Sequence, residues 1–208
     1  MRRPTGTAMK RHFPFVCIEG IDGTGKSTIA RQLADALGGQ YYKTPSGLYQ
    51  TIRAPIDEHA DAVARFYFYL SSVCFAAREI EEILQLCPVV CDRYIYSTYA
   101  YHFAMDPRLR ACVTPLPLLA PDLSILLTVS ESDRLARLRL RAAANVNSDA
   151  ELESDGEFLR RVEQEFRAMG MLVIDTTSTQ PEAIVEEITA RLVRTDAPAQ
   201  ATTTSSEA

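Results

Sequence analysis

The sequence of 208 residues lacks the features that two broad classes of protein require. No apolar run approaches the roughly 20 residues that a membrane-spanning helix needs. The net charge at pH 7 is −5, so no overall basic field favours nucleic acid as a partner. We therefore expect no contact with a membrane and no nucleic-acid interface, while the length suits one domain with a substantial core.

Secretory features are also missing from the sequence. Basic residues occur near the N-terminus, but no apolar stretch follows them to form a signal peptide, so residues 1–13 are interpreted as a flexible leader. The five cysteines are an odd number, which favours free thiols in a reducing cytoplasm. Cys87 and Cys91 have a spacing that metal ligands can have, but no second pair follows, so a zinc site is disfavoured.

The sequence does contain a phosphate-binding loop in a suitable setting. Residues 20–27 match the pattern G-x-x-x-x-G-K-[ST]. The apolar residues 15–18 before it have strand character, and residues 27–37 after it repeat apolar side chains at helical spacing until Gly38 ends the pattern. A strand, a glycine loop and a helix together point a helix N-terminus at an anion. A tight turn is the structural alternative, but these flanks favour phosphate binding.

The rest of the chain alternates strands with helices, which predicts an α/β fold with a parallel sheet. The aromatic-rich segment 60–86 is apolar around the whole helix, as in a buried helix or one that lines a pocket. Arg53 lies on a polar connection before it. The expected strands are 15–18, 40–44, 88–92, 123–129 and 171–175, and the expected helices are 27–37, 60–86, 157–168, 181–192 and one that begins after Ser130.

Polar residues beside these elements have the chemistry of phosphoryl transfer, in which positioning and positive charge do most of the catalysis. Lys26 would neutralise the outer phosphates of a nucleotide, and Ser27 and Asp92 would hold Mg²⁺. The alternative role for Asp92 is a cap at the end of its strand. Arg93 would lie over the carboxyl edge of the sheet and hold an acceptor phosphate by two parallel hydrogen bonds.

A set of arginines follows the strand at residues 123–129. Arg134, Arg137 and Arg141 share one stripe of a helix that leads into a polar segment. Arginines on helices are commonly just solvated, but this arrangement favours a closing lid at about residues 137–157. The kinase domain would then span residues 14–194, and the Thr- and Ser-rich residues 195–208 would form a disordered tail.

These motifs together resemble the thymidylate kinases, over roughly residues 14–193. Residues 15–28 look like the opening of that family, and residues 91–101 look like its second signature. Residues 121–123 and 172–175 resemble it as well. The resemblance implies a P-loop kinase fold with a five-stranded parallel sheet and an arginine-containing lid. It also implies transfer of the ATP γ-phosphate to a nucleoside monophosphate, usually dTMP, with Mg²⁺, and a homodimer formed by helix packing.

The resemblance implies roles for individual residues. Asp22 matches the acidic residue that contacts the sugar and phosphate region of the acceptor, and Arg93 matches the arginine on the acceptor phosphate. Lys43 stands in place of an arginine and keeps the charge without the bidentate fork. The expected catalytic residues are Lys26, Asp22, Arg93, Arg137 and Arg141; the ATP-binding residues are Gly23, Thr24, Gly25, Lys26, Ser27 and Thr28; the acceptor-binding residues are Asp22, Lys43, Arg53, Cys74, Arg78, Arg93, Ser97 and Tyr101; and the metal ligands are Ser27 and Asp92.

The expected base pocket departs from the family pattern. Arg78 matches the arginine that reads the thymine edge, but Cys74 stands where the family stacks a phenylalanine on the base. His102 replaces the usual glutamine. Phe75 or Tyr69 are the alternatives for stacking. The sequence therefore predicts an intact ATP site and an altered base pocket.

Two other functions remain open. A deoxynucleoside kinase would share the fold and the reaction class, but it would not need Lys43 and Arg53 near an acceptor phosphate. A non-catalytic nucleotide-binding module would not need several arginines in a lid, and the sequence has no Asn-Lys-x-Asp motif for reading guanine.

Overall fold

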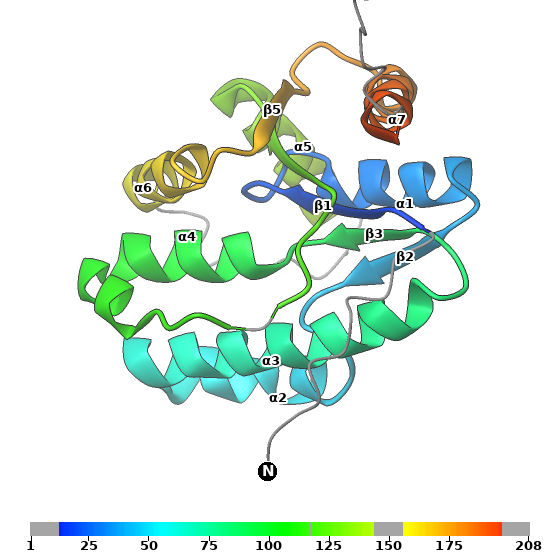
Figure 1. The fold of residues 1–208 in the computed structure, drawn as a ribbon. Helices are drawn as coiled ribbons and strands as arrows, with labels where there is room; N and C mark the ends of the chain where they lie inside the picture. Colours follow the sequence, from blue (N-terminus) through cyan, green and yellow to red (C-terminus); the bar gives the residue numbers. More distant parts are fainter. Residues whose placement is uncertain (1–12, 117, 144–155, 197–208) are drawn as a thin grey trace, which may run out of the picture.

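A five-stranded parallel sheet forms the centre of the protein in the computed structural model, which describes residues 13–116, 118–143 and 156–196 (Figure 1). The strand order is β2-β3-β1-β4-β5, and every neighbouring pair is parallel. The expected fold class is confirmed. The strands are β1 (Phe15–Glu19), β2 (Gln40–Lys43), β3 (Val89–Asp92), β4 (Leu123–Thr128) and β5 (Leu172–Asp175).

Helices cover both faces of this sheet, with α1 and α7 on one side and α2 and α3 on the other (Figure 1). Helices α4 and α6 pack together beside β4. The helices are α1 (Lys26–Ala36), α2 (Gly47–His59), α3 (Ala62–Ile83), α4 (Ile95–Met105), α5 (Glu131–Ala143), α6 (Gly156–Arg167) and α7 (Pro181–Asp196), with a 3₁₀ helix η1 (Pro107–Cys112) after α4.

The central strand β1 supplies side chains to both layers of the core. All five of its residues are buried, as a strand covered on both faces requires. Val16 and Ile18 pack with α1 and α7, whereas Phe15 and Cys17 pack with α3. Since neighbouring residues of a strand point to opposite faces, β1 is held from both sides and its C-terminal end is a rigid support for the loop that follows.

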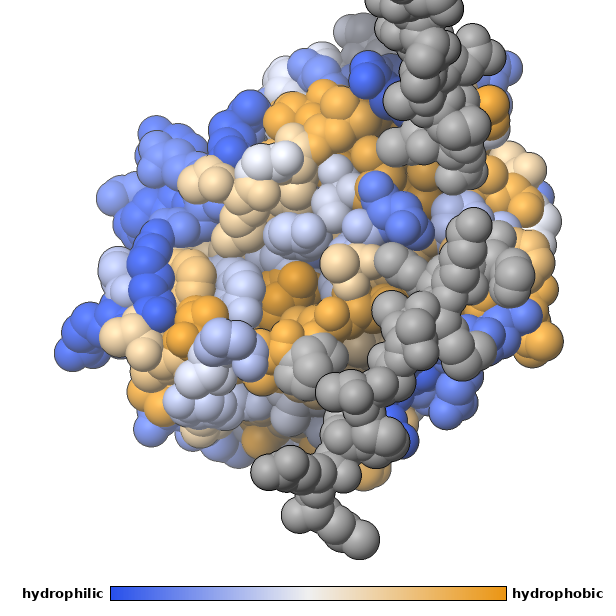
Figure 2. Space-filling view, viewed as in Figure 1, coloured by the Kyte–Doolittle hydropathy of each residue, from blue (hydrophilic) through white to orange (hydrophobic). Residues whose placement is uncertain are grey.

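Helix α6 shows how the outer helices are oriented. Phe158, Leu159, Val162 and Phe166 are buried against α4 and β4. The opposite side of the helix is charged, and Figure 2 shows hydrophilic residues over the position of α6. Apolar residues at helical spacing therefore determine which side of α6 faces the sheet.

Helix α2 is the largest difference from the sequence expectation. It covers the polar connection around Arg53 and contains Pro55 in its interior. Proline removes one backbone hydrogen bond and is unfavourable inside a helix. Packing outweighs this local preference, because the ring of Tyr49 contacts Phe68 and Phe75 of α3 at centroid distances of 5.5 and 5.7 Å.

The C-terminal helix also differs, since α7 extends to Asp196 rather than ending at residue 192. Residues 1–12 of the expected leader, residues 144–155 of the expected lid, and residues 197–208 of the expected tail lie outside the described residues. Within the described residues, every helix is too short or too polar to cross a lipid bilayer.

Candidate active site

The carboxyl ends of β1, β2 and β3 open onto a cavity of about 440 Å³. The phosphate loop leaves β1 at this edge, and Asp92 and Arg93 lie at the end of β3. Since β1 pairs with β3 on one side and β4 on the other, the edge is a topological switch point, where open α/β sheets bind their ligands. Helices α2, α3 and α4 supply the opposite wall of the cavity.

The phosphate loop adopts a conformation that needs glycine. Gly23 and Gly25 have φ values of 90° and 91°, in the left-handed region. A Cβ atom on Gly23 would lie 2.7 Å from Cγ of Arg134, so a larger residue would also collide with α5. Gly25 is the N-cap of α1, and the residues after it line the cavity. The start of α1 is therefore available for an anion.

Lys26, Asp22 and Arg93 form a row of alternating charge across the cavity. Lys26 is buried, and its Nζ donates to Oδ1 of Asp22 at 3.1 Å and to the carbonyl of Ile21 at 2.8 Å. Arg93 donates to the same oxygen of Asp22. Burial, followed by the positive charge of Arg93, lowers the pKa of Lys26. Asp22 thus holds together two cations, one from the start of α1 and one from the turn after β3.

Asp92 has one oxygen engaged and one available. Its Oδ2 accepts hydrogen bonds from Ser27 Oγ at 2.5 Å and from Tyr41 OH at 3.0 Å. Its Oδ1 is buried and has no hydrogen-bond partner in the described part of the chain. In that part, no group of three or more His, Cys, Asp or Glu side chains could hold a metal alone. One carboxylate plus substrate phosphates is the usual setting for Mg²⁺, so Ser27 and Asp92 fit this ion.

Arg93 is fixed from several directions. Its φ of 71° is uncommon for a residue other than glycine, and its backbone N–H donates to the carbonyl of Ile18 at 3.0 Å. Its Nη1 donates to Ser97 Oγ at 3.4 Å, and its guanidinium lies 5.5 Å from the ring centroid of Tyr101. Ser97 and Tyr101 also line the cavity. The structure therefore brings three of the expected acceptor-binding residues together.

The far end of the cavity contains a polar network between α2 and α3. Asp57 accepts a hydrogen bond from Arg53 Nε at 3.0 Å and from Tyr69 OH at 2.9 Å. Arg53 also donates to the Tyr69 hydroxyl at 2.9 Å. All three side chains line the cavity, as does Lys43 at the end of β2. Arg53 and Lys43 thus line the same cavity as Arg93, and their binding of an acceptor phosphate stays a prediction.

His102 of α4 lies beside this network. Its Nδ1 is 2.7 Å from the carbonyl oxygen of Thr98. Since a carbonyl oxygen only accepts, Nδ1 carries the proton and Nε2 is the acceptor of the ring. Burial lowers the pKa of His102 to about 4. The imidazole is therefore neutral near pH 7.

The expected arginine stripe of α5 separates into three roles. Arg134 is buried and donates to Glu131 at 2.7 and 2.9 Å. Arg137 donates to Thr176 at 2.7 and 3.0 Å and to the carbonyl of Gly23 at 3.3 Å, which braces the phosphate loop. Arg141 lines the main cavity. Of these three arginines, Arg141 alone is part of that lining.

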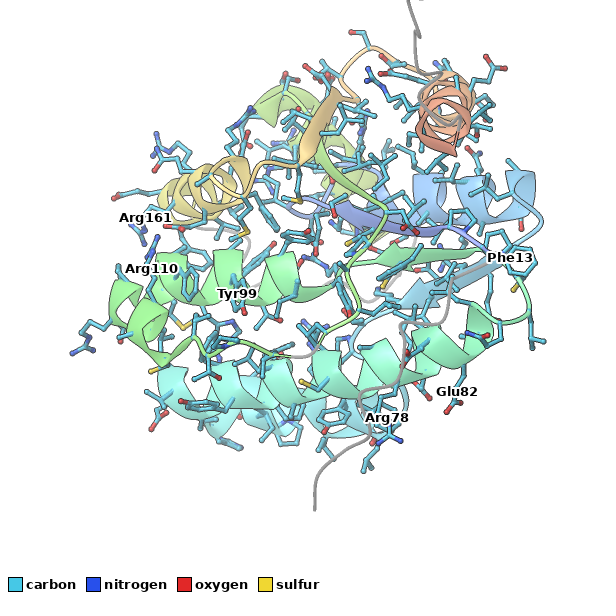
Figure 3. The ribbon with its side chains drawn as sticks, viewed as in Figure 1. Phe13, Arg78, Glu82, Tyr99, Arg110 and Arg161 are labelled. Carbon is cyan, nitrogen blue, oxygen red and sulfur yellow. The ribbon has the colours of Figure 1, made fainter. Side chains whose placement is uncertain are left out.

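Two of the expected acceptor-binding residues, Cys74 and Arg78, lie outside the cavity lining. Tyr69 and Ser72 are among the residues of α3 that line the cavity. Arg78 follows Tyr69 by nine residues, about two and a half turns, so it projects from the opposite side of the helix. It is exposed, and Figure 3 shows it on the side of α3 that faces away from the sheet. The burial of Phe66 and other apolar residues of α3 fixes this orientation.

Several residues that organise the site were not singled out from the sequence. Tyr41 contacts Asp92 from the neighbouring strand β2, and Asp57 contacts Arg53 from one turn later on the same helix, α2. Glu19 is buried directly before the phosphate loop. A carboxylate at the end of an apolar strand was the available signal for Glu19. The sequence gives no comparable signal for the other two residues. Tyr41 is 51 residues from Asp92 in the chain, and Asp57 lies with Arg53 on a helix that the sequence did not predict.

The comparison with known proteins agrees with this geometry. The family described as thymidylate kinase matches residues 18–188. The human protein named UMP-CMP kinase 2, mitochondrial, is 32% identical over 195 residues, which cover 84% of this chain and 42% of the human protein. This chain thus spans less than half the length of that relative. A protein of Methanococcus vannielii named probable thymidylate kinase is 28% identical over 192 residues, covering 84% of this chain and 92% of the relative.

The fold has solved counterparts. The structure of thymidylate kinase from Candida albicans is similar with a TM-score of 0.69 and 18% identity, covering 88% of this chain and 92% of the other. At that identity the likeness concerns the fold alone, whereas the family match covers most of the sequence. The chain therefore belongs to the thymidylate kinase family and is a nucleoside monophosphate kinase of that family.

Proposed function

We propose that the protein transfers the γ-phosphoryl group of ATP to a pyrimidine nucleoside monophosphate, with dTMP as the first candidate. The observation that carries this proposal is the single cavity that joins the phosphate loop to a second set of cations. Lys26 lies on the loop side, Arg93 and Lys43 lie beyond it at the ends of β3 and β2, and Arg53 lies farther along beside Asp57 and Tyr69. Two phosphate-bearing substrates need positive charge at both positions.

On the donor side, the N–H groups at the start of α1 and the ammonium of Lys26 would bind the outer phosphates of ATP. A second cavity of about 370 Å³ adjoins the loop, lined by Thr24, Thr28, Arg137 and residues 176–181. We place the adenosine of ATP there. Arg137 would offer its guanidinium plane to the base, since Thr176 already holds its orientation.

Mg²⁺ would be held by Ser27 and by the available oxygen of Asp92, together with phosphate oxygens. Such an ion neutralises charge on the transferring group and orients the phosphates. Tyr41 and Ser27 occupy the other oxygen of Asp92, so the carboxylate is oriented before any ion binds.

On the acceptor side, α4 sets the length of the site. Ser97 near its start and Met105 at its end both line the cavity. Eight residues at a rise of about 1.5 Å each span about 12 Å, which is comparable to a nucleoside monophosphate. A phosphate beside Arg93 would therefore place the base near His102 and Tyr69.

The acceptor phosphate is itself the nucleophile in this proposal. Its second pKa lies near 6, so it is largely a dianion at neutral pH and needs no general base. Arg93 and Lys43 would offset its repulsion from the ATP γ-phosphate. Lys26 and Arg141 would stabilise the charge on the transferring group, while Asp22 keeps Lys26 and Arg93 in place. Catalysis would then arise from positioning and positive charge.

A pyrimidine base is supported by the names of the relatives. One is a probable thymidylate kinase and another is a UMP-CMP kinase, and the bases in these names are all pyrimidines. The neutral ring of His102 offers a hydrogen-bond acceptor at Nε2. This atom is complementary to N3–H of thymine or uracil, or to the amino group of cytosine.

A deoxynucleoside kinase is the second candidate for the acceptor class. Its acceptor would be a neutral hydroxyl, which needs a general base more than it needs cations. Arg93 and Lys43 line the acceptor side, and the carboxylate of Asp22 is already engaged by Lys26 and Arg93. These charges favour an acceptor that carries a phosphate.

The test is ADP formation from ATP and Mg²⁺ with a panel of acceptors: dTMP, dUMP, UMP, CMP, dCMP, AMP, GMP and thymidine. We expect ADP release to require a pyrimidine monophosphate and to be negligible with thymidine. Lys26→Met is the control for background activity and should abolish the signal. Faster reaction with thymidine than with any monophosphate would contradict the proposal, as would release that no acceptor stimulates.

A further inference from the structure

Glu19 is a buried carboxylate that has no place in the phosphoryl-transfer scheme described so far. It is the last residue of β1, and its side chain has no solvent exposure. Three N–H and O–H donors converge on it, beside a weaker hydrogen bond from the thiol of Cys17 at 3.8 Å. The N–H groups of Tyr94 and Ser97 donate to Oε1 at 2.7 and 3.1 Å, and the hydroxyl of Ser97 donates to Oε2 at 2.5 Å. A buried carboxylate is costly unless it is bonded in this way.

These hydrogen bonds cap α4 from a distant strand. Helix α4 begins at Ile95, and its N-cap residue Tyr94 supplies no side-chain cap of its own. The first N–H groups of a helix have no partner within the helix, and a carboxylate oxygen is a strong acceptor for them. Glu19 occupies that position although it lies 75 residues before Tyr94.

The same strand end also holds Arg93. The carbonyl of Ile18 accepts the N–H of Arg93 at 3.0 Å, so Ile18 and Glu19 fix the whole turn from Arg93 to Ser97. The turn includes the positive φ of Arg93, a conformation that persists only where the surroundings impose it. The guanidinium of Arg93 in turn donates to the Ser97 hydroxyl.

We propose that Glu19 is a positioning residue for the acceptor phosphate, acting on Arg93 through Ser97 and the first turn of α4. This inference rests on the proposed function, since it assigns the acceptor phosphate to Arg93. The hydroxyl proton of Ser97 is used toward Glu19, which leaves the oxygen of Ser97 to accept from Arg93. Ser97 is then a link between the two residues, and the phosphate is held by Arg93 and its neighbouring cations.

The charge of Glu19 is part of this arrangement. The charged or titratable side chains that face it are Arg93 from the turn after β3, Cys17 from β1 and Cys91 from β3. Burial raises the pKa of Glu19 to about 6, although its hydrogen bonds from Ser97 and Tyr94 act in the opposite direction. Protonation would remove an acceptor from the Ser97 hydroxyl and so loosen the link to Arg93.

Glu19→Gln tests the proposal, because glutamine keeps the size of the side chain but replaces one acceptor oxygen by an NH₂ group. We expect the KM of the best acceptor to rise about tenfold or more, as a misplaced binding group causes, with the KM of ATP changed less than about twofold. Asp122→Asn is the matched control. Asp122 accepts the N–H of Phe15 at 2.7 Å at the other end of β1 and does not line the cavity, so its variant should keep both KM values.

Ser97→Ala provides a second test that does not depend on the folding of the Glu19 variant. It should raise the acceptor KM by a similar factor. The acceptor KM of the double variant should be no higher than that of either single variant, because both substitutions remove the same link from Glu19 to Arg93. The ratio of acceptor KM values between Glu19→Gln and wild type should approach one at pH 5, where Glu19 is protonated. Comparing the two proteins at each pH cancels the titration of the acceptor phosphate itself.

Three outcomes would each overturn the role of Glu19. The acceptor KM could be unchanged in both variants, the KM values of ATP and acceptor could rise equally, or the KM ratio between Glu19→Gln and wild type could be the same at pH 5 and pH 8. These outcomes differ from a failure of the proposed function. In that case the wild-type protein itself would release no ADP in response to any pyrimidine monophosphate.

Discussion

Replacing Arg93 with lysine is the most local perturbation of the acceptor site. Lysine keeps the positive charge, and the backbone φ of 71° is equally unfavourable for lysine and arginine, so the substitution leaves the backbone strain unchanged. It removes the planar fork that now donates to Asp22 and Ser97. The same fork would hold an acceptor phosphate by two parallel hydrogen bonds, a geometry that an ammonium group does not reproduce.

The expected loss can be worked from one charge-assisted hydrogen bond. Such a bond contributes about 1.5–3 kcal/mol, and about 1.4 kcal/mol corresponds to a factor of ten. Arg93→Lys should therefore lower kcat/KM for the acceptor about 10- to 100-fold. The KM of ATP should change less than about threefold, because the phosphate loop is formed by other residues.

The assay is steady-state ADP release with the acceptor varied at saturating ATP, followed by the reverse. Arg78→Lys is the matched control, since it makes the same chemical change on the exposed side of α3. It should leave the kinetics of both substrates unchanged. Wild-type acceptor kinetics for Arg93→Lys would refute the reasoning, and a large acceptor effect of Arg78→Lys would restore the base-reading role that the family resemblance suggested for Arg78.

Two further predictions concern the metal and pH. Tyr41→Phe removes one donor to Asp92, so the Mg²⁺ concentration for half-maximal activity should rise about tenfold; an unchanged Mg²⁺ titration would count against this role. Burial holds the pKa of His102 at about 4, below its ordinary 6.5, so stability is full above pH 6.5 and is lost as the pH falls toward 4. Wild type should lose roughly 3 kcal/mol more than His102→Gln between pH 7 and pH 4 in urea unfolding; parallel pH profiles would contradict this.

The phosphate loop and its flanking elements could be predicted from the sequence because their signals are local. The glycines, Lys26 and Ser27 lie within eight consecutive residues, and their flanking strand and helix have clear apolar periodicity. Parallel strands bring their carboxyl ends to one edge, which placed Asp92 and Arg93 beside the loop. Alternating strands and helices were sufficient for the fold class.

The acceptor side could not be predicted as well, because it depends on how α3 is rotated. Segment 62–83 is apolar on several sides, so the sequence does not show which side faces the cavity. The structure places Tyr69 and Arg65 there and puts Arg78 on the outside. Helix α2, stabilised by aromatic packing on α3 despite Pro55, adds Asp57 to the site.

In the proposed mechanism, one cavity holds the donor and acceptor phosphates side by side. A bisubstrate compound that joins adenosine to the nucleoside of the best acceptor through a chain of phosphates tests it most directly. Measured as inhibition of ADP release, this compound should compete with ATP and also with the nucleoside monophosphate, and Arg93→Lys should weaken its binding. Competition with ATP alone, with no effect on acceptor binding, would contradict the claim.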